Sequence, residues 1–306
     1  MKIVYLGTPD FAVAPLKKIV EDGKYQVVAV VTNCDKPVGR KKILTPPPVK
    51  VYAESKGIKV LQYDKIRFEG VEDLKEIKPD LMITCAFGQI LSQEILDIPK
   101  FGVINIHASL LPKYRGASPI HYAILNGEKT TGITVMKTDI GIDTGDMICQ
   151  EEIEIFPEET CGELFDRLSV LGAELINKVL PNIESGNCVF TPQDNSKATL
   201  TKMVKKEHAR INWCNDSSRI VNQIRAFNPS PVAFTILNGE PFKIYKAKVC
   251  DKVGKAGEIL SVDGELVVGT SNGSISLLRV QKAGGNAMEI KDFLRGCKLS
   301  VGDILG

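Results

Sequence analysis

Residues 1–32 have the sequence MKIVYLGTPDFAVAPLKKIVEDGKYQVVAVVT, in which two apolar, β-branched runs flank a segment of helical periodicity. The runs Lys2–Gly7 and Gln26–Thr32 are predicted to be strands, and residues 10–21 are predicted to form a helix that ends at Gly23. A strand, a helix and a second strand in this order favour a parallel pair with the helix on one face of the sheet.

The same alternation continues toward the middle of the chain. We predict helices over 48–56 and 71–77 and strands over 58–61, 81–86 and 102–107. Two more strands (132–138 and 146–155) and a long amphipathic helix (159–184) follow. The sequence therefore predicts an α/β fold with an open, mostly parallel, Rossmann-like sheet. Residues 33–49 contain four prolines, and we expect them to form an irregular, functional loop.

The last third of the chain has a different pattern. One helix (218–226) precedes short predicted strands over 242–249, 258–262, 265–269 and 274–280, and glycine-containing turns separate them. This spacing predicts a small C-terminal β-barrel of the oligonucleotide-binding type. We therefore divide the chain into a first domain (1–190), a polar linker (191–207) and a barrel domain (208–306).

Composition narrows the class of protein. The chain has 306 residues, 43% of them hydrophobic, and a formal net charge of +2, which is typical of a folded globular protein. Without a signal peptide or a long apolar run, we expect a cytoplasmic protein with no membrane partner. The eight cysteines lack metal-ligand spacing, so we expect reduced thiols and no metal. Residues 205–306 carry 15 Lys+Arg and 10 Asp+Glu, which suits a polyanionic partner or a solvated basic face.

Nucleotide-cofactor motifs are missing from the sequence. The first predicted strand leads into Gly7-Thr8-Pro9-Asp10-Phe11-Ala12, which has one glycine where the dinucleotide fingerprint needs three. The motifs of P-loop enzymes, zincins and α/β-hydrolases are absent as well. We therefore expect no dinucleotide cofactor.

Polar residues interrupt the strand 102–107. Asn105 and His107 are two apart, so they share one face of the strand at its carboxyl end, and Asp143 follows in a glycine-containing loop. One interpretation is a hydrogen-bonded core pair and an ordinary acidic turn. The other is an acyl-transfer group in which the amide stabilises an oxyanion, the imidazole carries a proton and the carboxylate orients it. Catalysis by Ser109 as a nucleophile is a third possibility.

Several motifs together identify a family. They are GTPDF at 7–11, NIHASLLP at 105–112, YRGASPI at 114–120, GIDTGD at 141–146, IRAFNP at 224–229 and QKAGG at 281–285. Over essentially the whole chain this pattern resembles the 10-formyltetrahydrofolate-dependent formyltransferases. The resemblance implies 10-formyltetrahydrofolate as co-substrate, methionyl-initiator-tRNA as formyl acceptor, a monomer, and the tail as a tRNA-binding domain.

The resemblance also implies roles for residues. Asn105, His107 and Asp143 would be catalytic. Folate would contact Phe87, Gly88, Gln89, Ile90 and Leu91, then Ser109, Leu110, Leu111 and Pro112, and the backbone of Asp139, Ile140 and Gly141. tRNA would contact Arg40, Lys41, Lys42, Lys205, Lys206 and Arg210. For Ile90 and Leu91, periodicity alone favours plain core packing.

Two other functions remain open on the sequence. An amino-sugar formyltransferase would keep the three catalytic residues and ignore tRNA. A non-enzymatic RNA-binding module would use the basic loop and the tail, and it would be indifferent to loss of His107.

Overall fold

The computed structural model describes residues 1–39 and 41–306 and divides them into two compact units. Unit 1 comprises Met1–Gly116, Thr131–Ile153 and Phe165–Thr201. Unit 2 comprises Ala117–Thr130, Glu154–Leu164 and Lys202–Gly306. Each unit is therefore assembled from three separate stretches of the chain.

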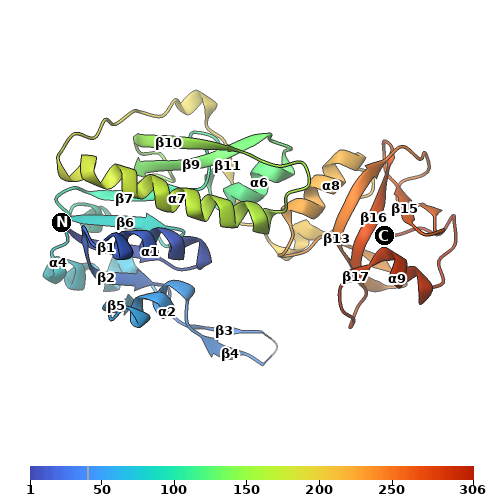
Figure 1. The fold of residues 1–306 in the computed structure, drawn as a ribbon, viewed down its shortest axis with the longest axis horizontal. Coiled ribbons are helices and arrows are strands. Elements are labelled where there is room, and N and C mark those ends of the chain that lie inside the picture. Colours follow the sequence, from blue (N-terminus) through green and yellow to red (C-terminus); the bar gives the residue numbers. More distant parts are fainter. Residues whose placement is uncertain (40) are drawn as a thin grey trace. The chain divides into compact units, whose positions relative to one another are not determined.

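A seven-stranded sheet forms the centre of unit 1 (Figure 1). Its order is β10 (Met147–Glu154), β9 (Thr130–Lys137), β7 (Val103–His107), β6 (Leu81–Cys85), β1 (Lys2–Gly7), β2 (Gln26–Thr32) and β5 (Val60–Gln62). The five strands from β7 to β5 are parallel, and β9 runs antiparallel to β7. The predicted mostly parallel sheet is confirmed.

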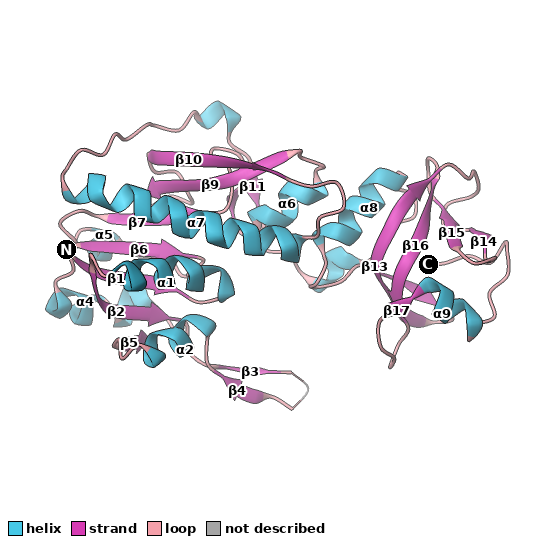
Figure 2. Cartoon of the chain, viewed as in Figure 1, coloured by secondary structure: helices cyan, strands magenta, loops and turns pink. Residues whose placement is uncertain are grey.

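Helices cover both faces of this sheet, which explains why residues 3–6 of β1 are all fully buried. The short helices α3 (Ile66–Glu69), α4 (Val71–Ile77) and α5 (Gln93–Leu96) share one core cluster with Val4, Leu6 and Val103. The helices α1 (Val13–Asp22) and α7 (Cys161–Glu184) run along the other face (Figure 2). There Gly172 permits close packing, because an added Cβ would come within 3.1 Å of Ile106 Cγ2. Helix α2 (Pro48–Ser55) packs against β2.

The expectation of an irregular loop over residues 33–49 is wrong. Strands β3 (Lys36–Val38) and β4 (Ile43–Thr45) pair as an antiparallel hairpin, with Lys36 opposite Thr45. Pro37 is tolerated because a two-stranded ribbon has free edges, where a missing N–H costs no ladder bond. The apolar side chains of this hairpin remain exposed. Without a buried face, the two strands show no alternation of apolar and polar residues by which they could have been predicted.

Unit 2 contains an antiparallel sheet ordered β12 (Phe234–Leu237), β13 (Glu240–Cys250), β16 (Ser274–Gln281), β15 (Leu266–Gly269) and β14 (Ile259–Ser261), with β17 (Met288–Glu289) beside β16. Asn238 and Gly239, both with positive φ, make the tight turn between β12 and β13. Helices α6 (Pro119–Leu125), α8 (Ser217–Ala226) and α9 (Ile290–Arg295) complete the unit. The predicted C-terminal barrel is thus an antiparallel half-barrel around one apolar core.

Two short strands in unit 1 had no signal in the sequence. The strand β8 (Arg115–Gly116) pairs in parallel with β11 (Leu200–Thr201), which follows the single-turn helix Asn195–Lys197. Residues 191–201, predicted as part of the linker, therefore belong to unit 1. Among the described helices, none has the length and apolar character needed to cross a bilayer.

Candidate functional site

Loops from three strands meet at the carboxyl edge of the parallel sheet. The chain order places β2 and β5 on one side of β1 and β6 and β7 on the other, so the strand order reverses between β1 and β6. In open α/β sheets, ligands bind in the crevice at such a point. Here Asn33 after β2 donates its Nδ2 proton to Phe87 O after β6 at 3.2 Å, and Thr8 Oγ1 after β1 lies 3.4 Å from the same oxygen.

The structure brings together the three polar residues that the sequence singled out. Asn105 Nδ2 donates to Asp143 Oδ1 at 3.3 Å, and His107 Nδ1 lies 3.5 Å from Asp143 Oδ2. Their neighbour Thr84 on β6 donates its hydroxyl to Asn105 Oδ1 at 3.0 Å, which points the amide NH₂ toward Asp143. Asn105 and Asp143 are 38 positions apart in the chain, so this group of side chains exists only in the folded protein.

The contacts of His107 hold its ring in one orientation. The ring is 6% exposed, and its Nε2 lies 3.0 Å from the carbonyl oxygen of Tyr114. A carbonyl only accepts, so Nε2 carries a proton. Nδ1 faces a carboxylate oxygen, and that contact is attractive only when Nδ1 is protonated too. These two partners fix the orientation of the ring.

Asp143 sits in an unusual backbone conformation. Its φ is +50°, in the left-handed region that few non-glycine residues adopt, and such conformations cluster at functional sites. The side chain is 18% exposed, and Gly116 donates its backbone N–H to Oδ2 at 2.7 Å. The carboxylate thus has three fixed neighbours: an amide, an imidazole and a backbone N–H.

Ser109 is placed unfavourably for nucleophilic catalysis. Its hydroxyl is buried and donates to Lys113 O at 2.7 Å, and its own carbonyl accepts from Thr134 Oγ1 at 2.6 Å. The side chain therefore closes a turn.

The residues proposed for folate differ in exposure. Phe87 and Leu91 belong to the core, as does Leu111, so the packing interpretation of Leu91 is correct. The packing interpretation of Ile90 is wrong, because that side chain is 66% exposed. Asp139, Ile140, Gly141 and Gly88 are exposed, while Leu110 and Pro112 are half-buried.

Both N–H groups of the Gln89 amide are bonded within the protein. It donates to Asn33 Oδ1 at 2.7 Å and to Tyr63 O at 2.9 Å, and it accepts from Ile66 N at 2.8 Å. Its side chain ties the loop after β6 to the loops after β2 and β5.

The basic residues proposed for tRNA lie in both units. Lys41 and Lys42 are exposed at the tip of the β3–β4 hairpin in unit 1, and Arg40 lies outside the described residues. Lys205, Lys206 and Arg210 are exposed in unit 2. Among the residues that the structure describes, no group of three or more His, Cys, Asp and Glu side chains could hold a metal ion.

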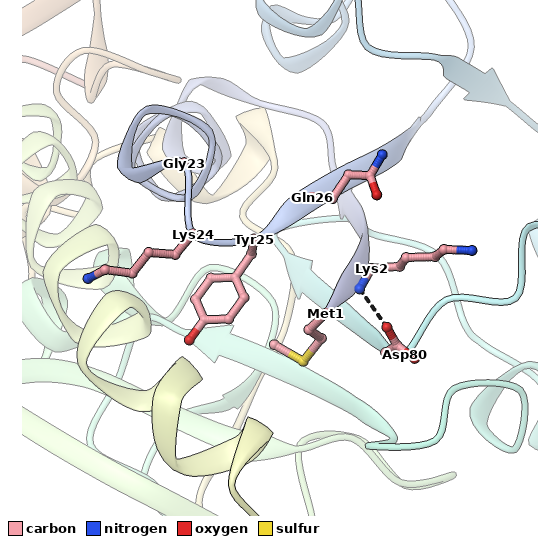
Figure 3. Close-up of a pocket in the computed structure, with 7 residues that line it drawn as sticks. All are labelled: Met1, Lys2, Gly23, Lys24, Tyr25, Gln26 and Asp80. Atoms are coloured by element: carbon pink, nitrogen blue, oxygen red, sulfur yellow. Dashed lines mark hydrogen bonds between the residues drawn. The ribbon is translucent and has the colours of Figure 1, made fainter.

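Two cavities lie away from the three polar residues. The first, about 370 Å³, opens where β1 and β2 begin, at the edge of the sheet opposite the site (Figure 3). There Lys2 donates its backbone N–H to Asp80 Oδ2 at 2.6 Å. The second, about 530 Å³, belongs to unit 2, and its lining includes Arg225, Lys246, Lys248 and Arg279.

Sequence reasoning missed the residues that orient the polar group: Thr84, Tyr114, Arg115, Gly116 and Gln193. Gln193 donates both protons of its amide, to Asp143 O at 2.8 Å and to Gly145 O at 2.7 Å. It lies in the aperiodic segment predicted as a linker, where no local pattern marks a buried side chain. The sequence shows only that a polar residue stands between Pro192 and Asp194.

Comparison with known proteins identifies two family models along the chain. A family model described as formyl transferase matches residues 1–180, and a second, formyl transferase C-terminal domain, matches residues 203–298. The methionyl-tRNA formyltransferase of Bacillus velezensis is 48% identical over 310 residues, which cover 100% of this chain and 98% of that protein. That of Bacillus subtilis is 46% identical with the same coverage.

Solved structures share the fold. An N-formyltransferase from Helicobacter canadensis, in complex with folinic acid and dTDP-3-aminofucose, is 24% identical with a TM-score of 0.70 over 92% of this chain and 99% of that one. HypX from Aquifex aeolicus, in complex with tetrahydrofolic acid, is 18% identical with a TM-score of 0.66 over 100% of this chain and 50% of that one.

Proposed function

The chain belongs to the methionyl-tRNA formyltransferases, a folate-dependent family, and we propose that Asn105, His107 and Asp143 carry out its transfer of a formyl group to methionyl-tRNA. The observation that carries this proposal is the convergence of an amide, an imidazole and a carboxylate within 3.5 Å at the carboxyl edge of the sheet. The formyl donor is 10-formyltetrahydrofolate, consumed as a co-substrate, with no metal and no dinucleotide in the reaction.

Charge develops on the formyl oxygen when the methionyl amine attacks the formyl carbon. The second Nδ2 proton of Asn105 and the Nδ1 proton of His107 stabilise this oxyanion. The 3.5 Å separation between Nδ1 and Asp143 Oδ2 is longer than a direct hydrogen bond, so this proton remains available to the substrate oxygen.

Proton transfers complete the reaction. The amine becomes an amide nitrogen and loses a proton, which Asp143 collects. The C–N bond to folate N10 then breaks as the oxyanion collapses to the carbonyl, and His107 returns a proton to N10. Because Nε2 stays bonded to Tyr114 O, the ring keeps its orientation through both steps.

The exposed residues near the three polar side chains are the ones that could contact folate directly. Ile90 and Ile140 offer aliphatic surface, and Gly88 and Gly141 offer backbone, to a flat and partly apolar ring system. The other residues of the proposed folate site would support this surface. They are Phe87, Gln89, Leu91, Ser109, Leu110, Leu111, Pro112 and Asp139.

For tRNA, we propose that Arg40, Lys41 and Lys42 contact the acceptor stem and that Lys205, Lys206 and Arg210 contact phosphates. The cavity in unit 2 has four basic residues and two acidic ones, Glu158 and Glu163, in its lining, and Lys246 pairs with Glu158 at 2.9 Å. The excess of basic residues supports a tRNA-binding role for residues 208–306, after a catalytic domain of 1–190 and a linker of 191–207. The protein acts as a monomer in the cytoplasm, on initiator tRNA.

Replacing Lys41 and Lys42 together by alanine should raise KM for methionyl-tRNA and leave KM for the folate unchanged. Each lost phosphate contact should also reduce the slope of log K against log salt by roughly 1. Steady-state kinetics from low to moderate salt measures both effects. The matched control is Lys17→Ala with Lys18→Ala, a second pair of exposed adjacent lysines on α1. An unchanged KM and salt slope in the hairpin variant would remove these lysines from the tRNA contact.

The experiment that tests the function is formyl transfer from 10-formyltetrahydrofolate, with methionyl-initiator-tRNA and a dTDP-amino sugar as alternative acceptors. We expect transfer to the tRNA alone, and loss of it in Asn105→Ala, where the oxyanion loses one donor. Transfer to the sugar alone would redirect the assignment to amino-sugar formylation. Tight tRNA binding without transfer would support an RNA-binding module.

A further inference from the structure

We infer that Gln193 is a positioning residue for formyl transfer: its amide holds the backbone of Asp143 and Gly145 and thereby places the Asp143 carboxylate beside His107. Arg115 in turn holds Gln193. The inference rests on the catalytic role proposed for Asp143. All of these residues belong to unit 1.

The amide of Gln193 is saturated. Its side chain is 9% exposed, and its two N–H groups go to the carbonyls of Asp143 and Gly145. Its oxygen accepts from Arg115 Nε at 3.0 Å and from Arg115 Nη2 at 2.8 Å. A flipped amide would set donors against the guanidinium and an acceptor against two carbonyls, so only one orientation fits.

The backbone that Gln193 holds needs an external partner. Lys137, the last residue of β9, pairs with Ile104, yet Asp143 reaches forward to Asn105 and His107, so the loop folds back along β7. Residues 139–142 of this loop are exposed. Asp143 at φ +50° lies in a conformation that the chain does not favour by itself. Gly145 is equally constrained, because an added Cβ would collide with Lys137 O.

Both ends of Asp143 are anchored to the same short strand. Gly116 of β8 donates directly to the carboxylate, and Arg115 of β8 holds the backbone carbonyl through Gln193. The guanidinium is 6% exposed and also donates to Asn195 Oδ1 at 2.8 Å. Pairing of β8 with β11, in which Thr201 Oγ1 donates to Arg115 O, fixes this strand in turn. Residues 193–201 therefore set the position of the carboxylate.

The direct test is Gln193→Glu. Glutamate is the same size and keeps an acceptor for Arg115, but it has no N–H for the carbonyls of Asp143 and Gly145. Misplacing a reacting group by about 1 Å can cost roughly 10² in rate. We expect kcat to fall about 10- to 100-fold with KM for methionyl-tRNA close to wild type. Gln193→Met, which removes the same donors without adding a charge, should lower kcat to the same order. Wild-type kcat in Gln193→Met would overturn the inference.

A double-mutant cycle separates this inference from the proposed function. If Gln193 acts through Asp143, Gln193→Glu should cost little further kcat in an Asp143→Asn background. An undiminished cost there would show that Gln193 acts independently and would overturn the inference. Wild-type kcat in Asp143→Asn alone would instead refute the role of Asp143, and the inference with it.

The control uses the second buried glutamine that bonds two carbonyls. Gln223 in unit 2 donates to His208 O at 2.9 Å and to Arg210 O at 3.2 Å. At saturating tRNA, Gln223→Glu should lower thermal stability without lowering kcat. Amide hydrogen exchange gives a readout independent of activity: residues 141–145 should exchange faster in Gln193→Glu and not in Gln223→Glu. Unchanged exchange in Gln193→Glu would contradict the role assigned to its amide.

Discussion

Replacing His107 by alanine is expected to lower kcat for formyl transfer by roughly 10³-fold, because one side chain supplies both an oxyanion donor and the proton for the leaving nitrogen. Folate and tRNA binding should persist, since neither substrate depends on the imidazole for its main contacts. Single-turnover kinetics at saturating substrates measures the chemical step directly.

His107 is buried, so the alanine variant leaves a small cavity and removes the contact between Nε2 and the Tyr114 carbonyl. His107→Asn, which keeps a donor near the position of Nδ1, should retain more activity than alanine at similar stability. The matched control is His121→Gln in unit 2, a histidine outside the site. Burial lowers the pKa of His121, so its removal changes little charge at neutral pH, and kcat should be unchanged. Near wild-type turnover in His107→Ala would refute the mechanism.

Replacing Asp143 by asparagine is expected to lower kcat by about 10³-fold as well. The variant is isosteric and can still accept from Gly116 N, so the loop should keep its conformation. It cannot collect the amine proton, and it leaves the imidazole without its anionic partner. The measurement is the rate of transfer at saturating substrates as a function of pH.

Part of the lost rate should return as the pH rises, because solvent base then takes the amine proton in place of the carboxylate. Asp146→Asn is the control within the same loop. Asp146 is tied to β9 through its backbone carbonyl, which accepts from Lys137 N at 2.8 Å, and the substitution leaves this contact intact, so the variant should keep wild-type kcat and pH profile. A wild-type rate in Asp143→Asn would mean that the carboxylate takes no part in proton transfer.

Predictions from the sequence were correct where the pattern of neighbouring residues determines the secondary structure of those same residues. The strands Lys2–Gly7 and Gln26–Thr32 and the helix Val71–Ile77 have the bounds that periodicity and glycine stops indicated. They failed where the burial of a side chain depends on residues far away in the sequence. The β3–β4 hairpin has no buried face, and Ile90 looks like a core residue in sequence yet lies exposed beyond the end of β6.

The sequence by itself determined the mostly parallel sheet, the C-terminal domain of short strands, and the placement of Asn105 and His107 on one face of a strand. Each of these depends on side-chain alternation or turn chemistry within a few residues. Only the tertiary structure decided that Asp143 completes the group and that Thr84, Gly116 and Gln193 orient it. Those contacts join residues up to 50 positions apart. Their geometry depends on the path of a loop held in a left-handed conformation, which side-chain periodicity does not encode.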